Sequence, residues 1–443
     1  MLLSTIIARL KESSLFNGSG SNLVQSDYLM DDKPIRVLMV TTEYPPMQGG
    51  VGRYTANLTR SLQKLGLDIY VVCNEKGKGD YYGLSPYNPH NSDVLLKAVY
   101  DSKADIVHIQ YEHGLYGLVL DPINPHKTTT NIDSFYHDCK VPIVTTFHSA
   151  YNFKEWLNLA TITQSASRVR RYGQFIMNYW KHLVNYNSFH DLNKEKLAMS
   201  KDSIVFSQYL SALIGSQNSS RRCNVIYHGA EPSPKVLFQP TKKEARSRFS
   251  LPQDRRIALA LGFTTATKGW KILEKMKVPD DWIVVVNSSK NHYNKENVNL
   301  RFNNSKNNSI IDLQKDFLDE ENLSFLFYAA DATILPYTVT SSSGVMFDGL
   351  AHGLPFVATD LGFFKEFCSK GLGITVKREP DAFANGLVTL ANDYDTYVRE
   401  VNKFKQKLKW DLIATQHSTL YEQVLKAKRA IVIRAPNSSY CRN

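Results

Sequence analysis

The stretch TTEYPPMQGGVGRYTANL, residues 41–58, decides the fold through what stands on either side of it. It follows the apolar run 37–40, which is typical of a buried strand, and it leads into an amphipathic helix that is expected to stop at Gly66. A glycine-rich turn into a helix exposes unpaired N–H groups at the positive end of the helix dipole. Such a turn suits a phosphate or another polar ligand; a plain strand-to-helix connection is the alternative.

This turn differs from the two common phosphate-binding motifs. Thr55 stands where the dinucleotide-binding pattern G-x-G-x-x-G needs its third glycine, and the loop from Val40 to Gly50 is too long for that tight turn. The Gly-Lys-Ser/Thr sequence of a P-loop does not follow it. The ligand of the turn is therefore left open by these motifs.

Apolar runs alternate with helical segments along most of the chain. Such alternation predicts parallel sheets covered by helices on both faces. With 443 residues the chain is too long for one ordinary core, so we expect an α/β fold of two doubly wound domains facing a central cleft. The runs of the first domain are 35–40, 67–73, 104–110, 141–147, 202–207 and 224–229; a proline-rich linker (231–255) precedes the second series, which starts at 256–263 and is interrupted by a polar loop at 290–310.

Composition restricts the function classes. Apolar residues make up 43% and charged residues 21%, as in soluble globular proteins, and no apolar run approaches the roughly 18 residues that cross a bilayer. Five cysteines without metal or redox spacing favour a reducing, cytoplasmic location. The net charge of +11 suits polyanions, but nucleic-acid motifs are absent, so a phosphate ligand or an anionic membrane surface is expected instead.

Several segments together resemble one known family. EYPPMQGGVGRYTANLTRSLQKLG (43–66) is similar to the first loop and helix of the retaining glycosyltransferases of family 4 (group 1), which have the GT-B fold. Other segments match in order and spacing, and the resemblance covers roughly residues 35–427. They are DIVHIQYEHGLYG (105–117), VPIVTTFHS (141–149), LGFTTATKGWKIL (261–273), FYAADATILPYTVTSSSGVMFDGLAHGLPFVATDLG (327–362) and KWDLIATQHSTLYEQVL (409–425).

The resemblance implies a division of labour between two Rossmann-like domains. It implies an acceptor domain at 34–232, a nucleotide-sugar donor domain at 233–408 and a closing helix at 409–429, between a disordered tail (1–33) and a second tail (430–443). The implied reaction moves a sugar from a UDP-, GDP- or ADP-sugar to a glycan, lipid-linked or other hydroxyl acceptor with retention of configuration. The family usually needs no cofactor and no metal, because positive side chains and amides neutralise the diphosphate.

The resemblance also implies site residues. Lys268, in the Lys-Gly position that binds the diphosphate, and His148, at a strand end near the sugar and acceptor, are the expected catalytic residues. Phe263 stands where the family often has arginine, which weakens the phosphate clamp or shifts its task to Arg53 or to backbone amides. The implied substrate-binding residues are Gly49, Gly50, Gly52, Arg53, Glu112, Thr340, Ser343, Gly344, Val345 and Asp348.

Two of these positions depart from the family pattern. Family members usually carry two glutamates separated by seven residues, the first on the sugar and the second on the ribose hydroxyls. Here Thr340 takes the first position and Asp348 the second. Aspartate keeps the carboxylate on a shorter side chain, whereas threonine retains only a hydroxyl. We therefore expect nucleotide binding through Asp348, and sugar recognition through hydroxyls and amides.

The segment 165–186 combines basic and aromatic residues, with no acid between 161 and 190. This composition is typical of an interfacial helix or of a site for a lipid phosphate, which would place the protein peripherally at the inner face of a membrane. A solvated face beside a core stripe is the alternative. The residues concerned are Arg168, Arg170, Arg171, Tyr172, Phe175, Tyr179, Trp180 and Lys181.

Rival functions stay open at this level. Phe263 and the altered acid pair favour a catalytically degenerate GT-B protein that acts as a binding or scaffold partner. A GT-B sugar-nucleotide epimerase is a second alternative. A phosphorylase needs a lysine-bound pyridoxal phosphate, for which the sequence offers no motif.

Overall fold

The computed structural model describes residues 33–160, 168–215, 222–290, 300, 302 and 309–434. Ile35–Asn443 form one compact unit. Nearly all of the expected tail 1–33, most of the polar loop at 290–310 and residues 435–443 lie outside the described residues.

The first sheet is parallel throughout, with the strand order β3-β2-β1-β4-β5-β6-β7. Its central strands β4 and β5 are buried at every residue, which explains their continuous apolar character. The strands are β1 (Arg36–Val40), β2 (Asp68–Cys73), β3 (Tyr81–Tyr82), β4 (Ile106–Tyr111), β5 (Ile143–Phe147), β6 (Asp202–Val205) and β7 (Asn224–Val225).

The second sheet is also parallel, in the order β10-β9-β8-β11-β12-β13. We call the elements around the first sheet the N-terminal half and those around the second the C-terminal half. The strands are β8 (Arg256–Phe263), β9 (Trp282–Ser289), β10 (Ile310–Asp312), β11 (Ala332–Leu335), β12 (Phe356–Thr359) and β13 (Gly373–Val376).

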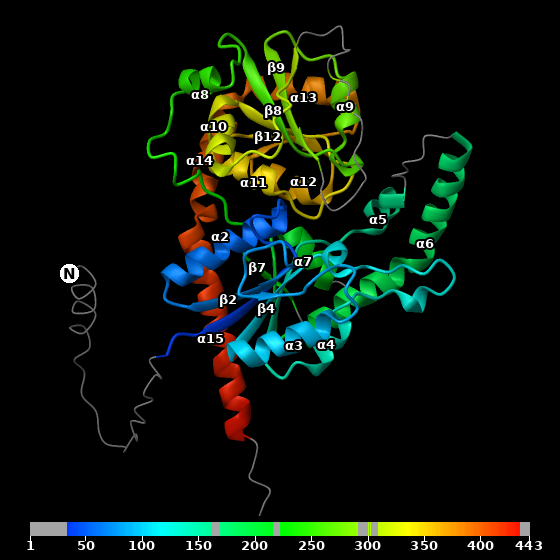
Figure 1. The fold of residues 1–443 in the computed structure, drawn as a ribbon. Coiled ribbons are helices and arrows are strands. Elements are labelled where there is room, and N and C mark those ends of the chain that lie inside the picture. Colours follow the sequence, from blue (N-terminus) through cyan, green and yellow to red (C-terminus); the bar gives the residue numbers. More distant parts are fainter. Residues whose placement is uncertain are drawn as a thin grey trace, which may run out of the picture. The chain divides into compact units, whose positions relative to one another are not determined.

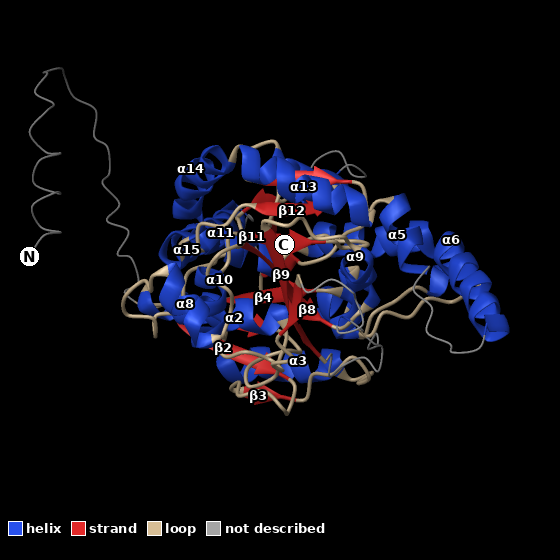
Figure 2. Ribbon diagram, turned by 90° about the horizontal axis from the view of Figure 1, so that it is seen from above, coloured by secondary structure: helices blue, strands red, loops and turns tan. Residues whose placement is uncertain are grey.

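Helices cover both sheets, as Figures 1 and 2 show. Those of the N-terminal half are α2 (Gly50–Lys64), α3 (Asn91–Ser102), α4 (Asp133–Asp138), α5 (Phe153–Ala160), α6 (Arg168–Met199) and α7 (Gln208–Gly215), with the 3-10 helices η1 (His113–Tyr116) and η2 (Pro125–Lys127). Those of the C-terminal half are α8 (Lys242–Arg248), η3 (Ala266–Lys268), α9 (Trp270–Lys275), α10 (Glu320–Ala329), α11 (Gly344–Ala351), α12 (Gly362–Cys368), α13 (Pro380–Asn392), α14 (Tyr394–Phe404) and η5 (Lys405–Leu408). The long helix α15 (Trp410–Arg434) ends the described chain.

The two halves share part of their core. One cluster of buried side chains contains Leu58 of α2, Phe347 of α11 and Ile413 of α15. Helix α15 packs against α2, and Figure 1 shows it running alongside the N-terminal half. The helix extends to Arg434, past the end that the sequence predicts at 429.

Two local expectations are wrong. The helix after the glycine-rich turn was expected to continue up to Gly66, but Lys64 is its last residue, and Leu65 follows it as the C-cap and is 45% exposed. The segment 231–255 is not only a linker: α8 forms inside it, started by a capping box in which Thr241 and Glu244 bond each other's backbone N–H.

The strand orders place the ligand-binding region. In the first sheet the direction of winding changes between β1 and β4, and in the second between β8 and β11. Ligands of open parallel sheets bind beyond the carboxyl ends of strands at such switch points. The loops after β1, β4, β8 and β11 are the ones that carry most of the predicted site.

Candidate active site

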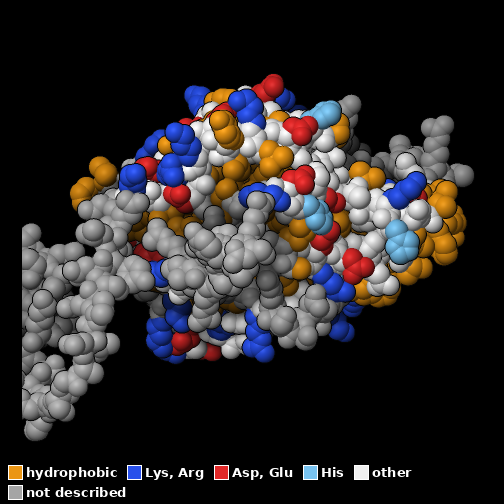
Figure 3. Space-filling view, turned by 90° about the horizontal axis from the view of Figure 1, so that it is seen from below, with side chains coloured by type: hydrophobic (Ala, Val, Ile, Leu, Met, Phe, Trp, Pro, Cys, Tyr) orange, Lys and Arg blue, Asp and Glu red, His pale blue; other side chains and the backbone are white. Residues whose placement is uncertain are grey.

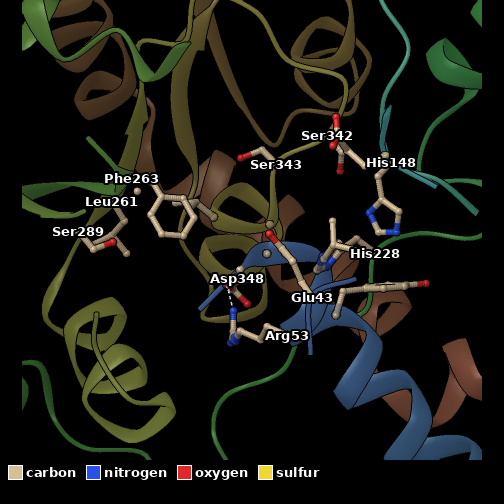
Figure 4. A pocket seen from close by; sticks show the side chains of 18 of the residues that line it. Glu43, Arg53, His148, His228, Leu261, Phe263, Ser289, Ser342, Ser343 and Asp348 are labelled. Carbon is tan, nitrogen blue, oxygen red and sulfur yellow. Dashed lines mark hydrogen bonds and ion pairs between the residues drawn. The ribbon is translucent and has the colours of Figure 1, made fainter. Parts of the chain in front are cut away.

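A cavity of about 780 Å³ is lined by both halves of the protein. Figure 4 shows side chains of the N-terminal half facing those of the C-terminal half across it. The N-terminal half contributes, among others, Glu43, Gly49, Gly50, Arg53, Glu112, His148 and His228. The C-terminal half contributes, among others, Phe263, Lys268, Ser289, Ser343, Gly344, Val345 and Asp348.

The glycine-rich turn after β1 closes around a carboxylate of the protein itself. A Cβ atom on Gly49 would lie 2.0 Å from Glu43 Oε2, and one on Gly52 would lie 3.0 Å from the Glu43 backbone. Gly50 meets nothing within 4 Å. The Gly52 N–H donates to Glu43 Oε2 over 3.4 Å. The anion at the N-terminus of α2 is therefore Glu43, which the sequence analysis did not single out.

The N-terminus of α11 remains open to a ligand. Ser343 caps this helix, and its Oγ accepts a hydrogen bond from the Met346 N–H over 3.2 Å. The N–H groups of Gly344 and Val345 belong to the first turn, where a helix supplies no internal partners. Both residues line the cavity, so these donors face the space in which an anion fits.

Asp348 forms an ion pair across the two halves. Its Oδ2 lies 2.5 Å from Arg53 Nη1, and the Asp348 side chain is 7% exposed. Arg53 Nε is buried without a hydrogen bond and lies 3.8 Å from Glu320 Oε1. Figure 4 shows the Arg53–Asp348 contact at the edge of the cavity. Any ligand that binds Asp348 must therefore share this carboxylate with Arg53 or displace Arg53 from it.

Lys268 is held beside the cavity by glycines with positive φ. Gly269 has φ +69°, and a Cβ there would lie 1.7 Å from the Pro336 carbonyl oxygen, so no other residue fits. The Lys268 Nζ lies 4.0 Å from the centre of the Tyr337 ring. This contact keeps the ammonium charge on the C-terminal side of the cavity.

The two histidines among the cavity-lining residues, His148 and His228, are uncharged at neutral pH. Burial, together with the nearby His228, lowers the pKa of His148 to about 3. Burial lowers the pKa of His228 to about 4. His148 Nε2 donates to Gln110 Oε1 over 2.9 Å, and its ring packs edge-on against Tyr54. His148 is therefore available as a neutral hydrogen-bonding group, not as a cation.

The remaining predicted residues divide into those that line the cavity and those that do not. Glu112 lines it, and its carboxylate caps η1 by accepting from the Leu115 N–H over 3.1 Å; burial raises the pKa of this group. Thr340 and Gly52 are not among the lining residues. The Thr340 hydroxyl donates to the Ser342 carbonyl over 2.7 Å, which turns it into the loop.

Among the lining residues that sequence reasoning missed, Glu43 and His228 are two that can take part in acid–base chemistry. Glu43 lies inside the quoted motif, and an acid immediately before YPP was a signal that the search for glycines passed over. His228 follows β7 as His148 follows β5, so the same strand-end argument applied to it. Within the described ranges, no group of three His, Cys, Asp or Glu side chains is placed to hold a metal ion.

Two family models match the chain. The Glycosyltransferase Family 4 model matches residues 48–233, and the Glycosyl transferases group 1 model matches residues 272–393. The two matches fall on the two halves and include the loops after β4, β5 and β11.

Relatives agree with these models. An uncharacterized glycosyltransferase of Methanocaldococcus jannaschii is 22% identical over 410 residues, which cover 88% of this chain and 98% of the relative. The solved sucrose-phosphate synthase of Thermosynechococcus elongatus has a TM-score of 0.63 at 16% identity, over 89% of this chain and 100% of that one. The Anabaena protein HepE has a TM-score of 0.54 at 14% identity, over 89% and 100%. The chain belongs to the glycosyltransferases of the family 4 and group 1 type, with the GT-B fold of two Rossmann-like halves.

Proposed function

We propose that the protein transfers a sugar from a nucleotide-sugar donor to a hydroxyl acceptor in this cavity. The first turn of α11 carries the proposal, because it opens on the cavity with Ser343 as its cap and with the N–H groups of Gly344 and Val345 unclaimed by the helix. A departing nucleoside diphosphate gains negative charge, which such donors and the helix dipole stabilise. HepE, which shares the fold, was solved with UDP and glucose.

The C-terminal half also supplies a positive side chain for the diphosphate. Lys268 lines the same cavity as the α11 N-terminus, and the task of the arginine for which Phe263 stands falls in this proposal to Arg53 and to the amides of α11. In the proposal Asp348 binds the ribose hydroxyls after sharing or releasing Arg53. A released Arg53 guanidinium then has donors free for phosphate oxygens.

We propose that the transfer proceeds with retention of the anomeric configuration. Retention in one step requires the acceptor hydroxyl to approach the face of the sugar from which the diphosphate leaves. The neutral His148 on the N-terminal side of the cavity supports this arrangement, because it offers a hydrogen-bonding group to a sugar or acceptor hydroxyl without a competing charge. Proton NMR of the first product formed distinguishes an α from a β linkage.

The first prediction concerns donor binding through Lys268. Lys268→Ala should weaken binding of the preferred member of a UDP-, GDP- and ADP-glucose panel by about 1.5–3 kcal/mol, the scale of a lost charge-assisted hydrogen bond. Isothermal titration calorimetry measures this change. Lys271→Ala is the matched control, because Lys271 is exposed on α9 and is not among the cavity-lining residues. Equal affinities for both variants would remove Lys268 from the donor site.

The same panel separates the alternative functions. Donor binding with slow release of free sugar supports a transferase, since water then acts as a poor acceptor. Conversion of one sugar nucleotide into its epimer would indicate an epimerase. A wild-type protein that binds no sugar nucleotide would favour the degenerate binding or scaffold protein.

We also propose that helix α6 attaches the protein to an anionic membrane surface. Of the described helices none is long and apolar enough to cross a membrane. Apolar side chains are nevertheless exposed along the first half of α6, at helical spacing. They are Tyr172, Ile176, Met177, Tyr179, Trp180 and Leu183, with exposed fractions from 38% to 69%. The side chains of Arg168, Arg170 and Arg171 lie outside the described part of the chain.

The position of α6 favours an interface over a core stripe for this half of the helix. Figures 1 and 2 show α6 at the edge of the N-terminal half, and Figure 3 shows hydrophobic side chains gathered along the corresponding edge. Only the second half of α6 reaches the core, where Phe189 stacks on Trp156. Aromatic rings without nearby acids suit the headgroup region of a bilayer.

The second prediction tests this attachment by vesicle flotation. The full chain should float with phosphatidylserine-containing vesicles at low salt and should dissociate at high salt, because basic residues meet anionic lipid. Ile176→Ala combined with Trp180→Ala should reduce flotation, whereas Tyr100→Ala on α3, an aromatic outside α6 that is even more exposed, should not. Equal flotation with neutral and anionic vesicles would contradict the electrostatic part of the proposal.

A further inference from the structure

Glu43 occupies an unusual place in the cavity. It stands three residues beyond β1, at the carboxyl end of the strand beside the switch point of the first sheet. Its side chain is only 8% exposed, yet it lines the cavity, and Figure 4 shows it extending between the Arg53–Asp348 pair and His228. Glu43 is therefore largely buried, while its carboxylate still reaches the cavity.

The surroundings hold this carboxylate in one orientation. Glu43 Oε2 accepts from the Gly52 N–H, and the approach of Gly49 is so close that a single added carbon would overlap it. The N-terminus of α2 directs its positive end at the same group. A side chain fixed in this way loses little conformational freedom when it binds a substrate group.

Three other acidic and imidazole groups of the cavity have side-chain or capping partners. Glu112 caps η1, Asp348 pairs with Arg53, and His148 Nε2 donates to Gln110. Among the described residues, the Glu43 carboxylate accepts hydrogen bonds only from backbone donors: Oε2 accepts from the Gly52 N–H, the Val51 N–H also lies close, and Oε1 has no side-chain hydrogen-bond partner. The N-terminal half thus offers one preorganised carboxylate oxygen to a ligand.

We propose that Glu43 accepts the hydrogen bond of the acceptor hydroxyl and takes up its proton during sugar transfer. The inference rests on the proposed function. The acceptor oxygen forms the new bond to the anomeric carbon as the bond from that carbon to the diphosphate oxygen breaks. The diphosphate leaves with the electron pair, toward Lys268 and the first turn of α11, and the proton moves to Glu43. Glu43 then returns this proton to solvent.

The acid–base properties of Glu43 support this role. Burial raises the pKa of Glu43 to about 7; the N–H groups of Gly52 and Val51 oppose the rise and Glu112 adds to it. The charge of Glu43 also contributes to raising the pKa of Tyr116. A base whose pKa lies near the working pH combines an ionised population with a useful affinity for the proton.

The experiment uses the full chain, the sugar nucleotide of the UDP-, GDP- and ADP-glucose panel that it binds best, and water as acceptor. Wild-type release of the nucleoside diphosphate should rise tenfold per pH unit below about 7 and level off above it. Glu43→Gln should lower the rate about 100-fold or more, the usual contribution of a general base, and should abolish that pH dependence. Donor affinity measured by calorimetry should stay within twofold, because Glu43 contacts the acceptor and not the donor in this proposal.

Two further variants keep the test decisive. Glu43→Asp withdraws the carboxylate by one methylene, so it should lower the rate while keeping a pH-dependent profile, and it answers the question if Glu43→Gln fails to fold. Glu112→Gln removes the neighbouring negative charge, so it should move the pH midpoint downward.

The possible negative results distinguish failure of the Glu43 inference from failure of the proposed function. If Glu43→Gln retains the wild-type rate and pH profile while binding donor, Glu43 does not take the proton and the inference is overturned. If Glu43→Asp behaves as wild type in rate and midpoint, the inference is overturned as well. If the wild-type protein binds none of the sugar nucleotides, the proposed function itself fails, whatever the variants do.

Discussion

At the scale of single residues, the glycines after β1 make room for a side chain of the protein itself. The close approach that the sequence indicates at Gly49 and Gly52 is real, but the approaching group is Glu43. A glycine in a motif indicates that another group lies close to the backbone, but it does not identify that group. Gly50, in the same turn, has open space where a Cβ would stand.

The third prediction follows from this difference. Gly49→Ala should lower the free energy of unfolding by about 1–3 kcal/mol, the usual cost of forcing an extra carbon into a packed site, as measured by urea denaturation. Gly50→Ala should be nearly neutral or slightly stabilising. Combining Gly49→Ala with Glu43→Ala should cost less than the sum of the single changes, because the overlapping carboxylate is gone. Equal effects at positions 49 and 50 would contradict the role assigned to Glu43.

The sequence predicted more of the site's location than of its contacts. The resemblance pointed to Lys268, His148 and Ser343, and all three line the cavity, in segments that follow β8, β5 and β11. The carboxyl ends of parallel strands meet at one edge, which is why such segments come together. The contacts that the site residues make could not be predicted from the sequence. Nothing in the spacing of Arg53 and Asp348, which are 295 residues apart, indicates that they meet at 2.5 Å. Thr340 took the position of a family glutamate in the sequence, but its loop turns the hydroxyl to Ser342.

At the scale of elements, periodicity predicted most strands and helices, and local polar contacts decided the rest. The strands predicted at 35–40 and 67–73 appear almost unchanged as β1 and β2. Short continuous apolar runs bounded by polar residues are typical of buried strands. Helix α8 was not predicted, because it lies among prolines and charged residues, although its Thr241–Glu244 capping box can be recognised in the sequence. For α6 the sequence left two interpretations open, since exposure depends on which neighbours the fold provides.

The fourth prediction compares two helix caps. Ser343→Ala and Thr241→Ala should each lower the free energy of unfolding by about 1 kcal/mol, because each removes a side-chain oxygen that accepts a backbone N–H. Only Ser343→Ala should also weaken binding of the sugar nucleotide in calorimetry, since Thr241 caps α8 and is not among the cavity-lining residues. Similar donor affinities for the two variants would mean that the α11 N-terminus does not hold the diphosphate.

At the scale of the whole molecule, α15 connects the C-terminal half to the core of the first sheet. The Tyr421 hydroxyl lies 2.6 Å from His108 Nδ1, and His108 Nε2 lies 2.7 Å from the Thr146 hydroxyl. The resemblance predicted a closing helix here, and apolar spacing alone gives no reason for this buried polar contact. Such a contact requires one register of α15 against β4, because unpaired polar groups in a core are costly.

The last prediction concerns acid stability, which follows from histidines buried in this core. Burial lowers the pKa of His113 to about 3 and that of His417 to about 4, and it holds the pKa of His108 well below its usual value. In the unfolded chain a histidine titrates near 6.5, so below that pH the unfolded state takes up protons that the native state refuses. The stabilisation is complete above pH ~6.5, and each such histidine removes about 1.4 kcal/mol per pH unit as the pH falls toward its native pKa.

Carboxyls with pKa values raised by burial act in the opposite direction and reduce the net effect. Burial raises the pKa of Glu43 and of Glu155 to about 7, so the native state holds their protons more firmly than the unfolded chain between pH ~4.5 and 7. His417→Leu removes one of the buried histidines that destabilise the fold at low pH, together with a buried Nε2 that has no partner.

Urea denaturation at several pH values should therefore show that the free energy of unfolding of the wild type falls below pH 6.5, and that this fall is about 1.4 kcal/mol per pH unit shallower in His417→Leu. His126→Ala, an exposed histidine, should leave the slope unchanged, and a slope equal in all three proteins would show that His417 accepts a proton in the folded state.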